Sequence, residues 1–321
     1  MTSNIWITIA HTITKTGFYS TTPMDFLLII LTMFFVKRNM GPYKYMITSF
    51  AALGIIFSSV EFLVLPIFHS FNAGFVLFSM TQISNSSNNL IHWLMVTFAC
   101  FYSSTISLLA VQFIYRYWAI FDQSKMLYFK SWRLSIWFFY VSFFGFFWGF
   151  GMHTFGSIDS DKYNFKYMER VVFDFYGQEL ETLPCFLVVV YDDKKQVRWY
   201  NCIYIFIMTA IMTSQYCIML YCGIQMNTNM HDKVSKFSES LRKLHQQIFR
   251  VLVLQVTLPT FFLFAPVVFI IYLPFLNWKV NLPSGIWLSG FTLYPALDAF
   301  LVMYIITDYH RAIKSEIPKR H

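Results

Sequence analysis

The stretch IWLSGFTLYPALDAFLVMYII at residues 286–306 decides the fold of this chain. As a helix, a run of this length spans about 30 Å, which matches the hydrocarbon core of a bilayer. It contains Pro295 and Asp298, and a proline and a carboxylate are costly in lipid unless the surrounding protein satisfies them. The stretch therefore predicts a membrane helix with a hinge and a buried acid. The amphipathic segment TDYHRAIK at 307–314 is expected to lie along the inner membrane surface.

The composition places the chain in the membrane class. Of its 321 residues, 57% are hydrophobic and 12% are charged, which is about half the charged share of soluble domains. The net charge of +8 is not combined with a nucleic-acid motif, so we interpret the basic residues as topology signals. We predict the lipid bilayer as a partner and no nucleic acid. The motifs G-x-S-x-G, H-E-x-x-H, C-x-x-C and the P-loop are absent, so we predict neither an enzyme nor a cofactor or metal site.

Seven apolar segments predict an all-α bundle of seven transmembrane helices within a receptor domain at 1–306, followed by a short tail at 307–321. No internal repeat is visible, which disfavours transporter folds built from repeats. A charged loop at 157–199 is long enough to hold a substructure of its own. The expected helices lie at about 16–36, 45–68, 90–120, 132–156, 200–223, 248–272 and 286–306.

Lysine and arginine counts predict which side of the membrane each loop occupies. Outside the loop at 157–199, sixteen basic residues lie in the connections after segments one, three and five and in the tail, whereas only Lys15 and Lys279 lie on the other side. The N-terminus is therefore expected outside the cell and the C-terminus in the cytosol. On this topology the sequon at Asn85 faces outward, where it is available for glycosylation.

Four residues are candidates for a ligand pocket. Glu61 lies about 24 Å along the second helix from Tyr45, in the outer half of the membrane. There a buried carboxylate is either part of a binding site or a packing group. His92, Trp93 and His153, near the outer ends of segments three and four, either face the pocket or lie at the membrane interface. A mainly aromatic cavity with few charges would favour a small, weakly polar ligand.

Two pairs of residues are candidates for a switch. Asp25 and Asp298 are predicted in the inner half of the membrane, within about 5 Å of each other in depth. They either share a proton, a water network or a cation between helices one and seven, or Asp25 bonds locally. Pro259 and Pro266 remove backbone donors from the sixth segment, where they form either a hinge or a static kink.

Several motifs resemble those of nematode Str-type seven-transmembrane chemoreceptors, and the resemblance covers nearly the whole chain. It implies a G-protein-coupled receptor that binds a small-molecule odorant, acts in olfaction and couples to a heterotrimeric G protein. It also implies the plasma membrane of the sensory cilium of chemosensory neurons as its location. Ala299 and His310 depart from the proline and arginine usual in the family. The matching motifs are GPYKY at 41–45, VEF at 60–62 with Pro66, YRY at 115–117, QQIFRVLVLQ at 246–255 with Pro259 and Pro266, YPALD at 294–298 and DY at 308–309.

The inner ends of the helices carry the candidates for G-protein coupling. Arg116, flanked by Tyr115 and Tyr117, sits where a cytoplasmic arginine holds an inactive state and then meets a G protein, or else it only reaches to the membrane interface. Leu241, on an expected extension of helix six at 232–250, and Arg311 in the tail would line the same cleft. The rival classes are a ligand-gated channel and a transporter of small molecules.

The cysteines give no clear disulfide. Cys100 is expected about 15 Å inside its helix, too deep for a bridge to Cys185 in the long loop. Cys202, near the outer end of segment five, stays open as an alternative partner.

Overall fold

A computed structural model describes residues 2–35, 42–81, 88–157, 162–234, 239, 253–254, 257–278, 280–306 and 309. The predicted site residues Asn85, Leu241 and Arg311 lie outside the described residues. So does most of the helix-six extension that the sequence predicts at 232–250.

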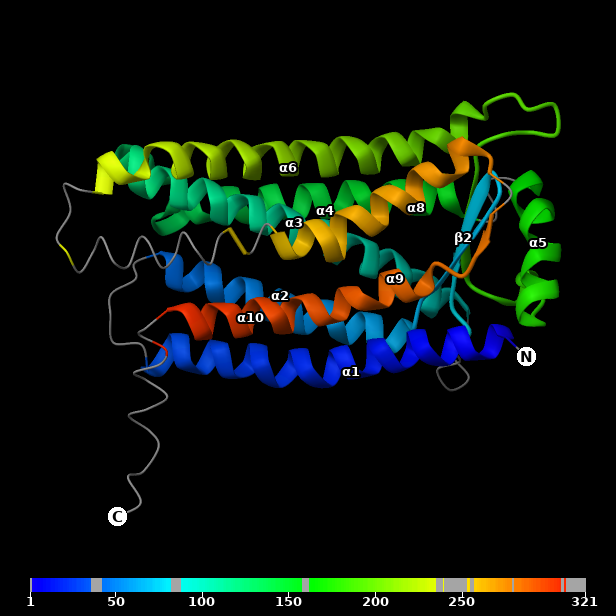
Figure 1. Ribbon diagram of the computed structural model, residues 1–321, viewed down its shortest axis with the longest axis horizontal. Helices are drawn as coiled ribbons and strands as arrows, with labels where there is room; N and C mark the ends of the chain where they lie inside the picture. Colours follow the sequence, from blue (N-terminus) through cyan, green and yellow to red (C-terminus); the bar gives the residue numbers. More distant parts are fainter. Residues whose placement is uncertain are drawn as a thin grey trace, which may run out of the picture.

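Long apolar helices run side by side along the molecule (Figure 1). Six of the described helices are long and apolar enough to cross a membrane, and α8, which continues from a π-helical segment, is a shorter apolar helix. The predicted all-α bundle is confirmed. Its elements are α1 (Thr2–Ile30) with a π-helical end (Leu31–Phe35), α2 (Tyr43–Val64), α3 (Asn88–Phe121), α4 (Leu134–Gly156), α6 (Trp199–Val234), the π-helical segment η6 (Thr260–Phe264), α8 (Ala265–Leu276), α9 (Gly285–Ser289), the 3₁₀ turn η7 (Gly290–Thr292) and α10 (Leu293–Ile305).

Two helices extend far beyond the bounds that the sequence predicts. α1 begins at Thr2 rather than near residue 16, because the mixed polar and apolar residues ahead of the membrane segment continue the same helix and bury Ala10 and Thr14 against the protein. α6 extends to Val234 rather than ending near residue 223, because residues 224–234 contain neither glycine nor proline to stop it. Hydropathy marks where a chain enters lipid, and a helix is free to continue beyond that point.

A four-stranded antiparallel sheet, which the sequence does not predict, covers one end of the bundle (Figure 1). Its strand order is β3-β2-β1-β4, and the strands come from three separate connections between helices. Because paired strands lie side by side, the sheet ties these three connections together at one end of the bundle, which we call the sheet end. The strands are β1 (Ile67–Phe71), β2 (Gly74–Phe78), β3 (Cys185–Val189) and β4 (Asn281–Leu282).

The sheet begins where α2 ends. α2 stops at Val64 rather than near residue 68, because Leu65 adopts a left-handed φ of 45° and Pro66 follows, which cannot donate to a helix. β1 then pairs with β2 through a two-residue turn in which Asn72 has a φ of 44°, a conformation that asparagine tolerates. Local backbone chemistry thus converts the end of an apolar segment into a strand.

The two faces of the sheet contact different parts of the protein. Side chains alternate between faces along a strand, so one face packs on helix α5 and the other packs on the membrane helices. α5 (Lys162–Tyr176) is amphipathic and buries Asn164, Met168, Val172 and Tyr176 at helical spacing. The face toward α5 carries Ile67, Val76, Phe78, Cys185, Leu187 and Val189. The face toward the bundle, which we call the inner face, carries Phe68, Phe75, Leu77, Phe186 and Val188.

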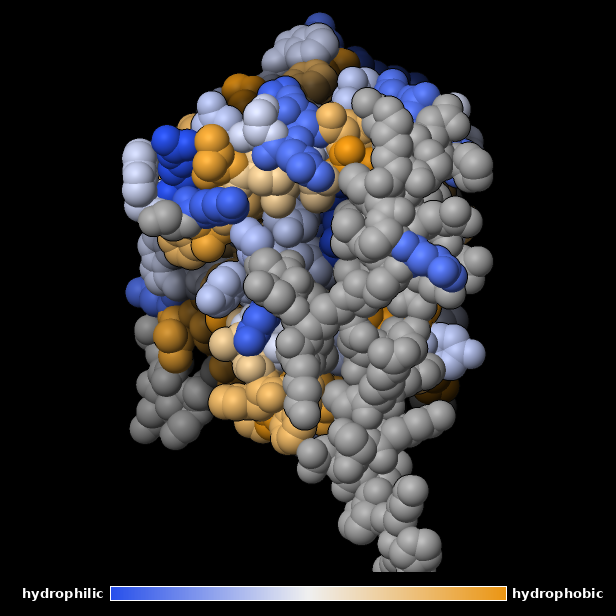
Figure 2. Space-filling view, turned by 90° about the vertical axis from the view of Figure 1, so that its left-hand side faces the viewer, coloured by the Kyte–Doolittle hydropathy of each residue, from blue (hydrophilic) through white to orange (hydrophobic). Residues whose placement is uncertain are grey.

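The end of the bundle away from the sheet, which we call the opposite end, is packed with aromatic rings beneath a polar surface. A 3₁₀ segment, η2 (Gln123–Phe129), follows α3 there, and Phe129 is buried against Tyr115 and Trp137. Figure 2 views this end and shows hydrophilic side chains over much of its described surface. The described basic residues here include Lys44, Lys125, Lys130 and Arg133.

His69 joins α5 to the sheet. It is fully buried on β1, and its Nδ1 lies 3.0 Å from the hydroxyl of Tyr176 on α5. Burial lowers the pKa of His69 to about 4, and the neighbouring Asn281 side chain opposes that shift only in part. The folded protein therefore holds a neutral imidazole, whereas an unfolded chain would bind a proton near pH 6.5.

We expect acid to weaken the contact between α5 and the sheet through His69. Above pH 6.5 the imidazole is neutral in both states and stability is unaffected. As the pH falls from 6.5 toward 4, protonation favours the unfolded chain, and the loss of folding free energy reaches about 2 kcal/mol at pH 5. Thermal unfolding of the purified protein at pH 7 and pH 5 measures this loss. The His69→Gln variant keeps a hydrogen-bonding group without the titration, so its pH difference should be smaller; an equal difference in both proteins would exclude His69 as the cause.

Candidate functional site

A cavity of about 80 Å³ lies between the inner face of the sheet and the membrane helices. Its lining is apolar apart from the side-chain polar atoms of Tyr102, Trp148 and Tyr204. Such a cavity suits a small apolar molecule, because an uncompensated polar group would lose its hydration on entry. Besides the five inner-face residues, the lining comprises Phe98, Ala99, Tyr102, Trp148, Met152, Tyr204, Met208, Val267, Ile270, Ile271, Leu288 and Phe291.

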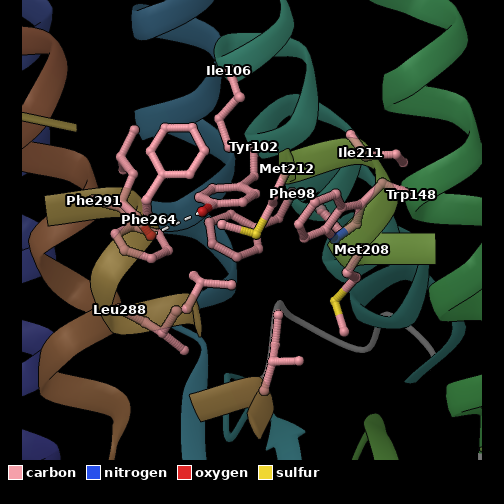
Figure 3. Close-up of a cluster of buried hydrophobic side chains, with 14 of the residues drawn as sticks. Phe98, Tyr102, Ile106, Trp148, Met208, Ile211, Met212, Phe264, Leu288 and Phe291 are labelled. Carbon is pink, nitrogen blue, oxygen red and sulfur yellow. Dashed lines mark hydrogen bonds between the residues drawn. The ribbon is translucent and has the colours of Figure 1, made fainter. Parts of the chain in front are cut away.

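Tyr102 of α3 lies at the centre of the aromatic cluster around this cavity (Figure 3). Its ring stacks on Phe291 with centroids 5.1 Å apart, and it meets Trp148 edge-on at 5.2 Å. Offset and edge-on pairs of this kind stabilise by about 0.5–1.5 kcal/mol beyond their burial. Tyr102 therefore contacts rings from α4 and from the 3₁₀ turn before α10 at once.

The hydroxyl of Tyr102 reaches the irregular part of the sixth membrane helix. This helix, which we call helix six, comprises η6 and α8 and is distinct from α6. It donates a hydrogen bond of 3.1 Å to the carbonyl oxygen of Leu263 (Figure 3). Leu263 lies in the π-helical segment Thr260–Phe264, which starts directly after Pro259 and ends just before Pro266. Prolines and π-helical turns interrupt the regular hydrogen-bond ladder of a helix. The cavity wall is thus bonded directly to the backbone where helix six is least regular.

Glu61 does not line this cavity. It is fully buried on α2 near Thr14 of α1, whose Oγ1 lies 3.5 Å from Glu61 Oε1. Its second oxygen, Oε2, has no hydrogen-bond partner among the described residues. The structure therefore places Glu61 in the contact between the first two helices.

His92, Trp93 and His153 also lie away from the cavity. They line an open groove at the sheet end together with residues of the long loop, among them Lys162 and Glu181. His92 Nε2 and His153 Nδ1 are 3.1 Å apart, so these side chains of α3 and α4 contact each other directly.

Asp25 and Asp298 are both buried and interact electrostatically across the α1–α10 contact. Tyr294 is buried near both carboxyl groups, and its hydroxyl has no hydrogen-bond partner in the described part of the chain. Gly54 of α2 lets this cluster close, because a Cβ there would meet Asp25 Oδ2 and would lie 2.8 Å from the Cβ of Pro295. The three helices α1, α2 and α10 therefore meet around a polar centre.

Arg116 is buried at the opposite end of the bundle. Its guanidinium carbon lies 3.0 Å from the ring centroid of Tyr43 on α2, a cation–π contact. Its Nε and Nη2 groups have no hydrogen-bond acceptor among the described residues. Tyr115 stacks on the same Tyr43 ring at 5.7 Å, whereas Tyr117 meets Tyr221 of α6 at 5.9 Å. This arginine thus packs on an aromatic ring, where an ion pair would have a carboxylate.

Comparison with known proteins identifies the kind of receptor. Residues 10–314 match the family model described as serpentine type 7TM GPCR chemoreceptor Str. The chain is 36% identical to the G-protein coupled receptor str-33 of Caenorhabditis elegans, over 95% of this chain and 90% of that protein. It belongs to the Str family of serpentine chemoreceptors.

Two further proteins are similar to this chain. The receptor is 27% identical to serpentine receptor class r-10 of Caenorhabditis elegans, over 98% of its own length and 92% of that protein. Its fold is similar to that of squid rhodopsin, with a TM-score of 0.63 at 13% identity, covering 98% of this chain and 86% of the rhodopsin chain. The predicted seven-transmembrane receptor fold is confirmed, and the protein is a multi-pass membrane receptor.

Sequence reasoning missed most of the residues around the cavity. The inner-face residues of the sheet lie in predicted loops or at the predicted end of a helix, and Tyr102 lies in an apolar run where nothing local distinguishes it from the other aromatic residues. The one available signal was the apolar stretch CFLVVV at 185–190 inside an otherwise charged loop, which is typical of a buried strand. All five cysteines are free, so neither Cys100 nor Cys202 is bridged to Cys185.

Removing the hydroxyl of Tyr102 should loosen the sixth helix. The Tyr102→Phe variant keeps the ring but removes the hydrogen bond from the hydroxyl to the Leu263 carbonyl, which should cost about 1 kcal/mol. We expect faster amide hydrogen exchange in residues 260–270, measured by mass spectrometry on purified protein. Tyr204→Phe is the matched control. Tyr204 also lines the cavity but lies on α6, which is not the helix that contains Leu263. Equal exchange in the wild type and Tyr102→Phe would show that this bond does not restrain helix six.

Proposed function

We propose that this receptor detects a small, weakly polar odorant in the cavity beneath the sheet and responds by activating a heterotrimeric G protein. The observation that carries the proposal is the hydrogen bond from Tyr102, in the cavity wall, to the π-helical segment of helix six. A ligand that displaces the Tyr102 ring changes the support of a helix that already has a weak point between Pro259 and Pro266. Family membership supports the same role.

The cavity volume bounds the size of the ligand. An apolar cavity of about 150 Å³ accommodates benzene, so 80 Å³ corresponds to a molecule of only a few carbon atoms. Unbranched side chains such as Met152 and Met208 line the wall and adapt readily to a guest. The expected ligands are therefore short aliphatic or other small volatile compounds, with at most a single polar group that Tyr102 or Tyr204 can meet.

The opposite end is the proposed site of G-protein coupling. Arg116 is held between helices by Tyr43. Its Nε and Nη2, which have no acceptor among the described residues, could bond to carbonyls of an incoming helix. Outward movement of helix six would open a cleft next to Arg116 and Tyr117. The remaining coupling residues that we propose, Leu241 and Arg311, lie outside the described residues.

The topology that fits this function places the sheet end outside the cell. The basic residues at the opposite end support a cytosolic location for that end under the positive-inside rule. We further propose the plasma membrane of a sensory cilium as the site of action and Asn85 as a glycosylation site. Antibody staining of an N-terminal epitope in unpermeabilised cells tests the orientation, and staining only after permeabilisation would overturn it.

Substitutions at Ala99 should change ligand size in opposite directions. Ala99 lines the cavity, so Ala99→Leu fills space and Ala99→Gly enlarges it. In cells that report calcium, screened with unbranched volatiles of increasing chain length, we expect Ala99→Gly to prefer a longer agonist than the wild type. Ala99→Leu should lose most of the response at equal surface expression. An unchanged preference in both variants would place the ligand elsewhere, and an agonist-evoked current without G protein would favour a channel.

Loss of the ring that faces Arg116 should raise basal signalling. Tyr43→Leu removes the cation–π contact, whose value of about 0.5–2 kcal/mol corresponds to a shift of roughly 2–30-fold toward a state in which Arg116 is released. Tyr43→Phe keeps the ring face and is the matched control. We would measure agonist-independent G-protein activation at equal receptor density. If Tyr43→Leu stays at the wild-type level, the contact is only structural.

A further inference from the structure

Two histidines from different helices face each other at the sheet end of the bundle. His92 of α3 and His153 of α4 approach through Nε2 and Nδ1, which are 3.1 Å apart. A hydrogen bond between two imidazoles requires one ring to accept, so the accepting ring is neutral. Neutral imidazole nitrogen is also the form that binds transition metals. Nothing in the role proposed for the cavity uses this pair.

The distance between the two nitrogens fits one shared metal ion. Zn²⁺ binds imidazole nitrogen at about 2.0–2.1 Å, so two nitrogens at tetrahedral positions lie about 3.3–3.4 Å apart. Neighbouring ligands of a square-planar Cu²⁺ or Ni²⁺ ion lie about 2.8–3.0 Å apart. The observed 3.1 Å falls between these values. The nitrogen–nitrogen distance therefore has to change by only a few tenths of an ångström, together with a tilt of both rings, for the pair to chelate one ion.

Aromatic neighbours hold both rings in this arrangement. The His92 ring lies 4.6 Å from that of Phe186 on β3, and the His153 ring lies 4.7 Å from that of Trp93. These contacts restrict the rotation of each imidazole, which reduces the entropy lost when a metal fixes them. Because Phe186 belongs to the inner face of the sheet, the pair also connects the sheet to α3 and α4.

The pair lines a groove of about 780 Å³ among the described residues, so a hydrated metal ion has room beside it. Glu181, Cys185 and Lys162 line the same groove, and burial raises the pKa of the Cys185 thiol, which keeps it protonated. Among the described residues no third histidine, cysteine or carboxylate completes a cluster with the pair. The site would thus supply two protein ligands and leave the other positions to water or to a solute.

We propose that His92 and His153 bind a divalent transition-metal ion, such as Zn²⁺, Cu²⁺ or Ni²⁺, between α3 and α4 at the rim of this groove. On binding, the proton shared by the two rings moves to the other nitrogen of the donor ring, so both facing nitrogens become ligands without net loss of a proton. The open coordination positions would accept a soluble amine, thiol or carboxylate. The metal would also fasten α3 to α4 next to the sheet.

Direct binding to the full-length protein tests this site independently of signalling. The receptor, purified in lipid nanodiscs through a tag without histidine, would be titrated with Zn²⁺ by calorimetry, with Mg²⁺ as a metal that prefers oxygen ligands. We expect one Zn²⁺ per chain and binding at least tenfold weaker in His92→Gln and in His153→Gln. His11→Gln, which alters a histidine on α1, should bind like the wild type. Equal Zn²⁺ affinity in wild type and in both site variants would overturn the proposal.

A spectroscopic measurement on the wild type covers the case in which a variant does not fold. Cu²⁺ bound at the site should give an electron paramagnetic resonance spectrum with nitrogen hyperfine splitting from two imidazoles. A saturated sample with no nitrogen splitting, or with splitting from a single nitrogen, would exclude the paired site.

Discussion

In a bilayer, every buried backbone carbonyl must find a donor within the protein, and this constraint decides where the helices of this receptor can be irregular. Helix six departs from regular α-helical geometry at Thr260–Phe264, between two prolines, and there Tyr102 donates to the carbonyl of Leu263. The same tyrosine ring packs on Phe291 and Trp148. One side chain thus donates to an irregular backbone and forms part of a cavity wall, so it joins the cavity directly to the segment Thr260–Phe264.

The inner face of the sheet forms one wall of that cavity. Three connections between helices would each be exposed loops on their own, but their pairing satisfies the backbone groups that a buried loop would leave without partners. Period-two alternation then supplies two apolar faces, one toward α5 and one toward the bundle. The inner face of the sheet and the helices that it covers therefore share one hydrophobic core. Movement of α5 or of β3 would shift the residues that line the cavity and would shift His92, whose ring packs on Phe186.

Polar side chains inside the bundle lie mainly in contacts between helices. Glu61 lies between α1 and α2, Asp25 and Asp298 lie where α1 meets α10, and Arg116 lies against α2. Buried polar groups with incomplete hydrogen bonding are costly, and several atoms here have no partner among the described residues. Helix contacts built around such groups are more easily rearranged than contacts between apolar surfaces alone, because a second arrangement can satisfy what the first leaves open. This property suits a receptor that alternates between states.

The sequence alone determined the membrane bundle, because the length of an apolar run and the placement of charges are local properties set by the thickness and dielectric of a bilayer. It also brought out the motifs of the family, the buried acids Asp25 and Asp298 and the two prolines of helix six. Only the tertiary structure decided the rest. Strand pairing across residues 67–282 has no local signature, so the sheet and the cavity beneath it could not be read from hydropathy. The same holds for Glu61. Its facing direction, toward α1 and away from the cavity, depends on how the helices rotate as they pack.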